Sequence, residues 1–342
     1  PRVYAVAPGA VRLLDSLGAW ARVAALRAGA YTRMEVWEGS AAQALAFDAA
    51  EMAVPELGFI VEDAALRASL WPAVAGAATV LAGTAVTGYA REDGITRLAL
   101  ADGSTLEAGL VIAAEGADSP LREWAGIDAG GWDYPQRALV SHVETQRPRA
   151  DTAYQRFLPL GPLALLPLPD GRSSIVWSTR SNEAEELLGL DDAAFAQRLE
   201  EALDRRLGGI GACSPRRSFP LRLLHASAYV ADGLALVGDS AHVVHPLAGQ
   251  GLNLGLGDVA ALAEVVAEAR GKCQPLASLR VLQRYERRRR AANIEALALT
   301  DGLHRLFGMR GGQIESLREL GLSMFGRAGP LKHALARRAM GL

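Results

Sequence analysis

The spacing of apolar and polar residues divides the chain into helical and strand-like segments. Apolar residues three or four positions apart predict helices at 8–20, 62–75, 191–208 and 255–269, and an almost wholly helical chain after Pro275. Period-two alternation predicts strands near 33–38, 44–48, 79–89, 95–101 and 104–108. Helices and strands are therefore mixed along most of the chain.

Two short apolar runs show no alternation. They are LVIAAEG at 110–116 and GLALVGD at 233–239, and each contains a glycine at its carboxyl end. A continuous run of this kind is typical of a parallel strand that is buried on both faces. Between the two runs, residues 131–229 hold strand-like pieces separated by Pro and Gly. This pattern predicts a sheet domain inserted into an α/β domain.

The predicted fold class is therefore α/β: a Rossmann-like ligand-binding domain, an inserted mixed or antiparallel β-sheet domain, and C-terminal helices. The ligand-binding domain is discontinuous and is expected to comprise residues 1–30, 56–130 and 230–285. The inserted domain is expected to comprise 31–55 and 131–229, and the helical region 286–342. A length of 342 residues suits two domains.

Composition narrows the class of protein. Half of the residues are apolar, which is enough for a sizeable core. The sequence has no uninterrupted apolar stretch of about 18 residues, so a membrane-spanning helix is not expected. Cys213 and Cys273 are the only cysteines and lie far apart, so they provide neither a disulfide framework nor a zinc site. These features predict a cytoplasmic protein.

The net charge of −2 is unevenly distributed. Residues 280–342 hold 13 Arg and Lys against 5 Asp and Glu, a net charge of +8, which leaves −10 for the first 279 residues. A basic amphipathic tail indicates either solvated helix faces or contact with anionic lipid or an acidic partner. Aromatic and basic residues are not interleaved, so no nucleic acid partner is predicted.

The stretch GDSAHVVHPLAGQGLNLGLGDV at 238–259 holds the strongest chemical signal. Gly238 permits a turn, and Asp239 follows at the carboxyl end of the strand, where α/β sheets bind ligands. A carboxylate there can accept hydrogen bonds from the hydroxyls of a ribityl chain or a ribose. Gly249 and Gly251 let a flat ligand approach the start of the following helix, whose N–H groups favour negative charge. A flavin fits these features, and a glycine-rich turn that only closes a sheet is the alternative.

Two further motifs give weaker signals. His242 and His245 form an H-x-x-H pair, but no third metal ligand is nearby in the sequence, so no metal site is predicted. The second motif, AAEGADSPLR at 113–122, repeats the pattern of a strand that leads into a turn. Asp118 is expected to bind Arg122 or to cap the helix that follows it.

Together these motifs resemble the class A flavoprotein monooxygenases, which have the para-hydroxybenzoate hydroxylase fold, and among them the ubiquinone-biosynthesis hydroxylases. The resemblance runs from the first residue to about 341. Besides the two motifs above, it is carried by RVYAVAPGAVRLLDSLGAW, DYPQRALV, AYQRFLPLGPLALLPL and LQRYERRR.

The resemblance implies roles for individual residues. It implies that Asp239, after Gly238, binds the ribityl chain of FAD, and that Pro246 is the catalytic residue, beside the ring where oxygen reacts. The isoalloxazine edge would be held by Gly249, Gln250, Gly251, Leu252 and Asn253. Asp118 belongs to the motif associated with the pyrophosphates of FAD and NAD(P)H, and Arg2 matches an arginine near the flavin.

The sequence departs from the family pattern in three places. Nothing matches the N-terminal GxGxxG unit, so roughly one βαβ half of ~30 residues or more is expected to be missing from the protein or only from the chain as given, and this chain is expected to bind FAD poorly. The usual Asp-Gly is Glu115-Gly116, which is expected to weaken pyridine-nucleotide handling. The usual GDAAH is GDSAH, and Ser240 is expected to be benign.

The implied reaction uses FAD as cofactor and NAD(P)H as co-substrate, and passes through a flavin C4a-hydroperoxide to hydroxylate an aromatic ring, a polyprenyl phenol in ubiquinone biosynthesis. Candidate substrate contacts on the inserted sheet are Gln155, Phe157, Leu165 and Trp177, each of which could equally belong to the core. A flavin reductase without oxygen insertion and a non-catalytic scaffold subunit are the alternatives.

A membrane-soluble substrate suggests a use for the basic C-terminal helices. The apolar residues there are Leu306, Phe307, Met324 and Phe325. They could dock at the periphery of the inner membrane or on partner subunits of a biosynthetic complex. Packing within the protein is the alternative.

Overall fold

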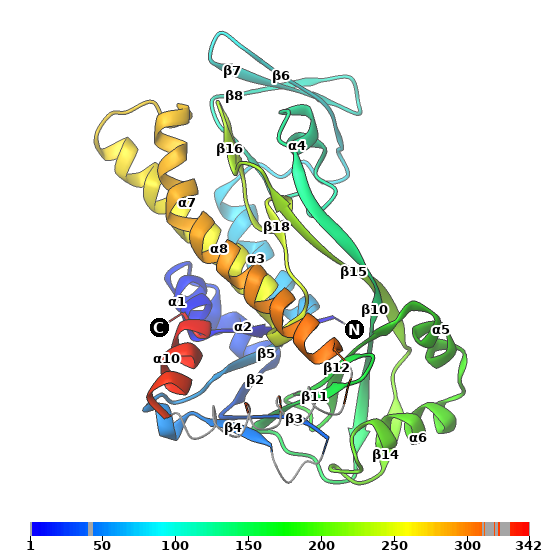
Figure 1. Ribbon diagram of the computed structural model, residues 1–342. Helices are drawn as coiled ribbons and strands as arrows, with labels where there is room; N and C mark the ends of the chain where they lie inside the picture. Colours follow the sequence, from blue (N-terminus) through cyan, green and yellow to red (C-terminus); the bar gives the residue numbers. More distant parts are fainter. Residues whose placement is uncertain are drawn as a thin grey trace.

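A nine-stranded sheet forms the lower half of the molecule in Figure 1, and its two longest strands continue upward. The computed structural model describes residues 2–39, 44–309, 311, 318, 321 and 329–341. The strand order is β18 (His242–Val243), β15 (Arg217–Ala226), β10 (Ala129–Thr145), β13 (Ser173–Arg180), β12 (Gly161–Pro167), β11 (Thr152–Leu158), β3 (Arg33–Glu38) and β4 (Leu45–Asp48), with β14 (Ile210–Cys213) beside β10. Only β11 and β3 pair in parallel, so the sheet is mixed.

The two faces of this sheet have different neighbours. On one face the helices α5 (Ser181–Gly189) and α6 (Asp192–Ala202) cover a core that includes Leu139, Leu163 and Phe195. On the other face, Tyr134 and Ala138 of β10 share a cluster with Leu297. Because side chains alternate along a strand, neighbouring positions of β10 contribute to different cores.

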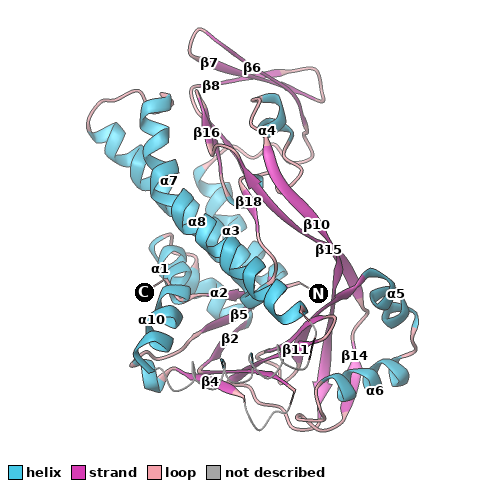
Figure 2. Ribbon diagram, viewed as in Figure 1, coloured by secondary structure: helices cyan, strands magenta, loops and turns pink. Residues whose placement is uncertain are grey.

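A second body contains the turn that follows the strand predicted at 233–239. Its central sheet has the order β16 (Val230–Ala231), β17 (Leu234–Leu236) and β9 (Val111–Ala113), and β17 and β9 are parallel. The long helices α7 (Gln250–Gly271) and α8 (Leu279–Gly308) run side by side and cover it (Figure 2). A short helix, α4 (Pro120–Trp124), follows β9.

Two antiparallel sheets complete the described fold. The first has the order β1 (Val3–Val6), β5 (Gly58–Glu62) and β2 (Ala28–Tyr31), and the second β6 (Val86–Glu92), β7 (Ile95–Leu100) and β8 (Thr105–Ala108). The accompanying helices are α1 (Pro8–Ser16), α2 (Trp20–Arg27), α3 (Asp63–Ala77) and α10 (Gly329–Ala339). The sheet of β6, β7 and β8 lies at the top of Figure 1, where Tyr89 and Leu98 pack against the core of the second body.

Several predicted elements have different boundaries in the structure. The single helix expected at 8–20 is wrong, because α1 ends at Ser16 and Gly18 has a positive φ of 65° before α2 begins. Helix α5 and strand β5 have no counterpart in the expected elements. The expected domain boundary between 285 and 286 falls inside α8, which is one continuous helix. Strand β18 lies within 230–285 but pairs with β15 of the inserted sheet.

None of the described helices combines the length and apolarity that crossing a bilayer requires.

Candidate active site

The turn after β17 presents an exposed carboxylate. β17 ends at Leu236, and Gly238 has a φ of 59°, a left-handed conformation that favours glycine. Asp239 follows in a short 3₁₀ turn, Gly238–Ser240, and is exposed. Its carboxylate makes no hydrogen bond to any described residue. It therefore has its acceptor sites available for a ligand.

A buried aspartate of α7 fixes the turn at Gly238. Asp258 of α7 is fully buried, and its carboxylate accepts hydrogen bonds from Gly238 N at 3.1 Å, Arg289 Nε at 2.8 Å and Asn293 Nδ2 at 3.0 Å. His242 Nε2 lies 2.6 Å from the same carboxylate. Burial alone would raise the pKa of Asp258, but these partners lower it below the ordinary value. Asp258 and Arg289 are not among the site residues that the sequence motifs predicted.

The two histidines of the H-x-x-H pair occupy different surroundings. While His242 contacts Asp258, His245 lies against His304, with ring centroids 4.7 Å apart. Burial, together with the neighbouring His304, lowers the pKa of His245 to about 3, so its ring is neutral at pH 7. The described part of the chain contains no group of three residues that could hold a metal ion.

The two motif turns are joined by the hydroxyl of Ser240. Ser240 is fully buried, and its Oγ accepts hydrogen bonds from the backbone N–H groups of Glu115 at 2.9 Å and Gly116 at 3.2 Å. The carboxylate of Glu115 accepts from Ser119 Oγ at 2.5 Å. Ser240 therefore has a structural role that the expectation of a benign substitution did not include.

We expect Ser240→Ala to lower the free energy of unfolding by about 1–3 kcal/mol, because two backbone N–H groups lose their buried acceptor. Urea unfolding would measure the change. Ser16→Ala, at an exposed helix position, is the matched control, and it should alter stability by at most about 0.5 kcal/mol. Equal effects of the two substitutions would contradict the role of Ser240.

Asp118 does not make the contacts expected of it. Its carboxylate accepts a hydrogen bond from Arg222 at 2.8 Å, and this bond holds the pKa of the exposed Asp118 carboxyl below its usual value. Arg122 instead donates to the carbonyls of Ala117 and Ser240. The cap of α4 is Ser119, whose Oγ accepts from Arg122 N at 3.2 Å. The expected contact with Arg122 and the expected cap are therefore both wrong.

The start of α7 is open to a ligand. Gly249 precedes the helix with a φ of 62°, no side chain caps this helix end, and its first turn has no acidic residue. A Cβ at Gly249 would lie 3.0 Å from Ala5 Cβ, so a larger residue would disturb β1. Since the first N–H groups of a helix have no partner within the helix, those of Gln250, Gly251 and Leu252 form a binding surface for a negatively charged group.

The side chain of Asn253 is used within the protein. Its Nδ2 donates to Ala5 O at 2.8 Å, and its Oδ1 accepts from Ala7 N at 2.9 Å. These two bonds fix the start of α7 against β1. Arg2 precedes β1, is exposed, and its guanidinium lies 5.1 Å from the Tyr4 ring centroid.

Helix α7 packs closely against the turn that holds Asp239, because both have a glycine at the point of contact. A Cβ at Gly255 would lie 3.2 Å from Gly238 Cα, tighter than most real contacts. Because of this close approach, the turn that holds Asp239 packs against α7 about one and a half turns after the start of the helix. Pro246 lies just before this helix, in a segment that continues into the 3₁₀ turn Leu247–Gly249.

We expect Gly255→Ala to be less stable than Gly302→Ala by about 1–3 kcal/mol, the typical cost of overpacking. Both glycines lie in helices, so the gain in helix propensity cancels in the comparison. A Cβ at Gly302 would meet nothing within 4 Å. Thermal unfolding of the two variants would measure the difference. Equal stabilities would show that α7 does not need this close contact.

The four candidate substrate contacts fall on different faces of the large sheet. Phe157 belongs to a cluster with Leu247, and Gln155 lies two residues before it on the same face of β11. Leu165 and Trp177 instead lie in the core beneath α5 and α6. For these two, the core alternative is correct.

The described C-terminal residues do not all face outward. Phe307 is buried and stacks on Phe157, with ring centroids 3.7 Å apart and an interplanar angle of 9°. A role for Phe307 in docking to a membrane is therefore wrong. Leu306 is 42% exposed, whereas Met324 and Phe325 lie outside the described residues.

The residues present suit an FAD. The free carboxylate of Asp239 can accept from ribityl hydroxyls, and the uncapped end of α7 can face an electron-rich ring edge without an obstructing side chain. These features lie next to each other, as a single ligand requires.

Comparisons with known proteins agree with this arrangement. A family described as FAD binding domain matches residues 1–300. The chain is 38% identical over its whole length to 3-demethoxyubiquinol 3-hydroxylase of Escherichia coli, of which it covers 87%. It is 40% identical over 99% of its length to ubiquinone hydroxylase UbiL of Rhodospirillum rubrum, of which it covers 79%.

Solved structures show the same fold. PqsL of Pseudomonas aeruginosa, described as a probable FAD-dependent monooxygenase, matches with a TM-score of 0.78 and 24% identity, over 94% of this chain and 89% of that one. The p-nitrophenol 4-monooxygenase PnpA of Pseudomonas putida also gives a TM-score of 0.78, with 19% identity, over 99% of this chain and 87% of that one. The chain therefore belongs to the FAD-binding monooxygenase family, within its group of ubiquinone-biosynthesis hydroxylases.

Proposed function

We propose that this hydroxylase uses NAD(P)H and O₂ to hydroxylate the ring of a polyprenyl phenol in ubiquinone biosynthesis. One oxygen atom of O₂ enters the ring as a hydroxyl, the other leaves as water, and NAD(P)H supplies the two electrons. FAD, when bound, supplies the redox chemistry that activates oxygen. The observation that carries the proposal is the unpaired Asp239 carboxylate beside the uncapped start of α7.

Residues of the Asp239 turn and of the start of α7 would each contact a different part of FAD. Asp239 would accept hydrogen bonds from the ribityl hydroxyls. The turn at Gly238 places its carboxylate at the end of β17. The N–H groups of Gln250, Gly251 and Leu252 would stabilise negative charge on the ring edge, an electrostatic contribution that needs no rearrangement. Gly249 keeps the approach clear. Asn253 acts as a positioning residue, because its side chain already bonds Ala5 and Ala7.

The remaining assignments concern the surroundings of the ring. Pro246 would lie beside the ring and limit the access of water to the reacting oxygen. Arg2 would contribute positive charge next to β1. Asp118, which is 86% exposed while it pairs with Arg222, would orient this arginine toward a pyrophosphate. Gln155 and Phe157 would contact the substrate from the large sheet.

The names of the relatives support the class of substrate. The Escherichia coli and Rhodospirillum rubrum relatives are named for ubiquinol and ubiquinone hydroxylation. Intermediates of that chemistry carry a phenolic ring and an apolar tail, so their source would be a membrane. We propose that the protein works in the cytoplasm at the periphery of the inner membrane, through the basic residues near its C-terminus or through partner subunits.

The first experiment is an absorbance spectrum of the protein purified from its full reading frame. It is followed by NAD(P)H oxidation assays with and without a prenylated phenol. We expect the bands of oxidised flavin, faster oxidation with the phenol, and a hydroxylated product. NAD(P)H oxidation without a hydroxylated product would favour the reductase, and a colourless protein that FAD does not reconstitute would favour the scaffold.

A further inference from the structure

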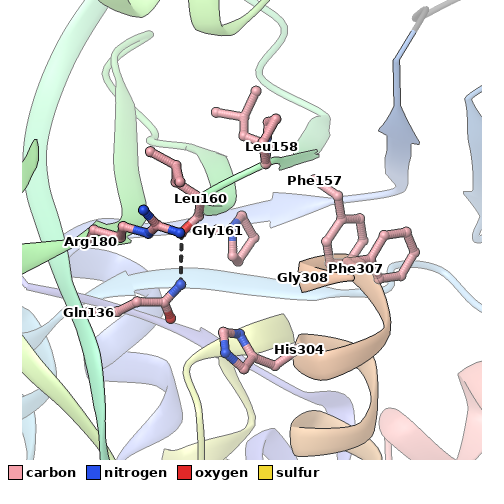
Figure 3. Close-up of a pocket in the computed structure, with 11 residues that line it drawn as sticks. Gln136, Phe157, Leu158, Leu160, Gly161, Arg180, His304, Phe307 and Gly308 are labelled. Carbon is pink, nitrogen blue, oxygen red and sulfur yellow. Dashed lines mark hydrogen bonds between the residues drawn. The ribbon is translucent and has the colours of Figure 1, made fainter. Parts of the chain in front are cut away.

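A small cavity lies between the large sheet and the end of α8. Its volume is about 130 Å³. The sheet contributes Gln136, Arg180 and the segment from Phe157 to Pro162, and α8 contributes His304, Phe307 and Gly308. Figure 3 shows Gln136 and Arg180 on one side of the cavity and the stacked rings of Phe157 and Phe307 on the other. The cavity therefore has a polar side and an aromatic side.

The size of the cavity suits one six-membered ring. An apolar protein cavity of about 150 Å³ binds benzene, whereas one water occupies about 30 Å³ of liquid. The aromatic side is preformed, because Phe157 and Phe307 are both buried and already in contact. Gly161 lines the cavity without a side chain, and a Cβ there would lie 2.3 Å from Ser178 O. A larger residue at this position would therefore clash with the backbone of β13.

The polar side contains an unsatisfied acceptor. Gln136 is 8% exposed, and its Nε2 donates to Leu160 O at 2.7 Å. Its Oε1 is buried and has no hydrogen-bond partner among the residues that the structure describes. Since buried polar atoms are almost always paired, an acceptor of this kind indicates a missing donor. A ligand hydroxyl is one such donor.

Arg180 supplies the complementary group. It lies directly opposite Gln136 in the ladder between β10 and β13, so the two side chains share one face of the sheet. Its guanidinium makes no hydrogen bond or ion pair with any described residue. The register of β10 against β15 shifts between Asp133 and Arg137, and an irregularity of this kind changes the direction of nearby side chains.

We propose that this cavity binds one phenolic ring, whose hydroxyl donates to Gln136 Oε1 and accepts from the guanidinium of Arg180. The phenol as substrate class rests on the proposed function. The cavity lies close to the segment around Pro246, because Phe157 and Phe307 also contact Leu247 and His304 stacks on His245. A ring bound here would therefore lie near the segment that holds Pro246, and the cavity would act as a recognition site beside the proposed position of reaction.

The test compares the binding of ortho-prenylphenol and its methyl ether by calorimetry, using the flavin-loaded protein. The ether has the same ring but has no hydroxyl to donate. For the unaltered protein we expect the phenol to bind about 10-fold more tightly than the ether. In Gln136→Leu this preference should fall to about 1, because the acceptor is gone. Arg180→Met should weaken phenol binding by about 10-fold and remain folded, since Arg180 is exposed.

The control is Arg217→Met, at another exposed arginine of the same sheet that has no ion-pair partner among the described residues. It should leave both affinities unchanged. If Gln136→Leu retains the full preference for the phenol and Arg180→Met retains the full affinity for it, the proposed site is wrong. Conversion of ortho-prenylphenol to a hydroxylated product is measured separately. If product forms but the variants keep the preference for the phenol, this site alone is wrong. If the unaltered protein neither binds the phenol nor forms product, the proposed function is wrong as well.

Discussion

Asp258→Ala is expected to lower the free energy of unfolding by about 3–5 kcal/mol, the range for removing one partner of a buried charge pair. The fully buried carboxylate accepts from Arg289 and Asn293, contacts His242, and holds the N–H of Gly238. Removal leaves the Arg289 guanidinium, whose side chain is only 17% exposed, without its counter-charge. Urea unfolding, together with the flavin content of the purified variant, would measure the effect.

The control for this variant is Asp232→Ala. Asp232 pairs with Arg91 at 3.0 Å, but its side chain is 57% exposed, so the loss should be at most about 1 kcal/mol. Equal losses at the two positions would contradict the importance that we assign to the buried network.

The pH dependence of stability provides a second measurement on Asp258. Its pKa in the folded protein is lowered from an ordinary value of 3.8. A carboxyl with a lowered pKa contributes stability above its unfolded-state pKa, and this contribution is lost as the pH falls through the folded-state value. The difference in unfolding free energy between the unaltered protein and Asp258→Asn should therefore be constant from about pH 5 to 7 and decrease below about pH 4. A constant difference down to about pH 2 would contradict this assignment.

Asp239→Ala is expected to weaken FAD binding by about 10- to 100-fold, because hydrogen bonds to a charged acceptor contribute about 1.5–3 kcal/mol. The stability of the flavin-free protein should change by at most about 0.5 kcal/mol, since the exposed carboxylate makes no hydrogen bond within the described chain. Titration of the flavin-free protein with FAD, followed by fluorescence, would measure the dissociation constant.

Asp15→Ala is the matched control for Asp239. Asp15 is likewise exposed, on α1, and makes no side-chain hydrogen bond with the described residues. It should leave the dissociation constant unchanged. An Asp239→Ala variant that binds FAD as tightly as the unaltered protein would show that the ribityl chain is held elsewhere.

The sequence predicted the residues of the proposed cofactor surface better than it predicted the buried contacts that support them. Gly238, Asp239 and Gly249 follow from local rules, because positive φ angles and strand ends have clear residue preferences. Asp258 does not follow from such rules. It is the one polar residue among the buried residues of α7, and its partners Arg289 and Asn293 come from another helix. The signal that could have identified Asp258 is a charged residue at a position that falls in the apolar stripe of the helix.

The sheet contacts show a second limit of sequence patterns. The expected contacts on β12 and β13 included Leu165 and Trp177, which lie beneath α5 and α6. Both faces of this sheet are covered, so apolar residues occur at successive positions and the alternation does not identify the outer face. Gln136 and Arg180 were missed for a related reason. Their relation depends on the register of two strands that are far apart in the chain.

Helix α8 connects the two parts of the molecule that the proposals concern. Arg289 reaches Asp258 from one part of the helix, and Phe307 meets Phe157 near its end. These positions are roughly 27 Å apart along the axis, at about 1.5 Å per residue. Because α8 is one continuous helix, it joins the proposed phenol site to the contacts that hold the turn at Gly238. Thermodynamic linkage then requires reciprocity: any factor by which a bound ring changes the affinity for FAD is the factor by which FAD changes the affinity for the ring.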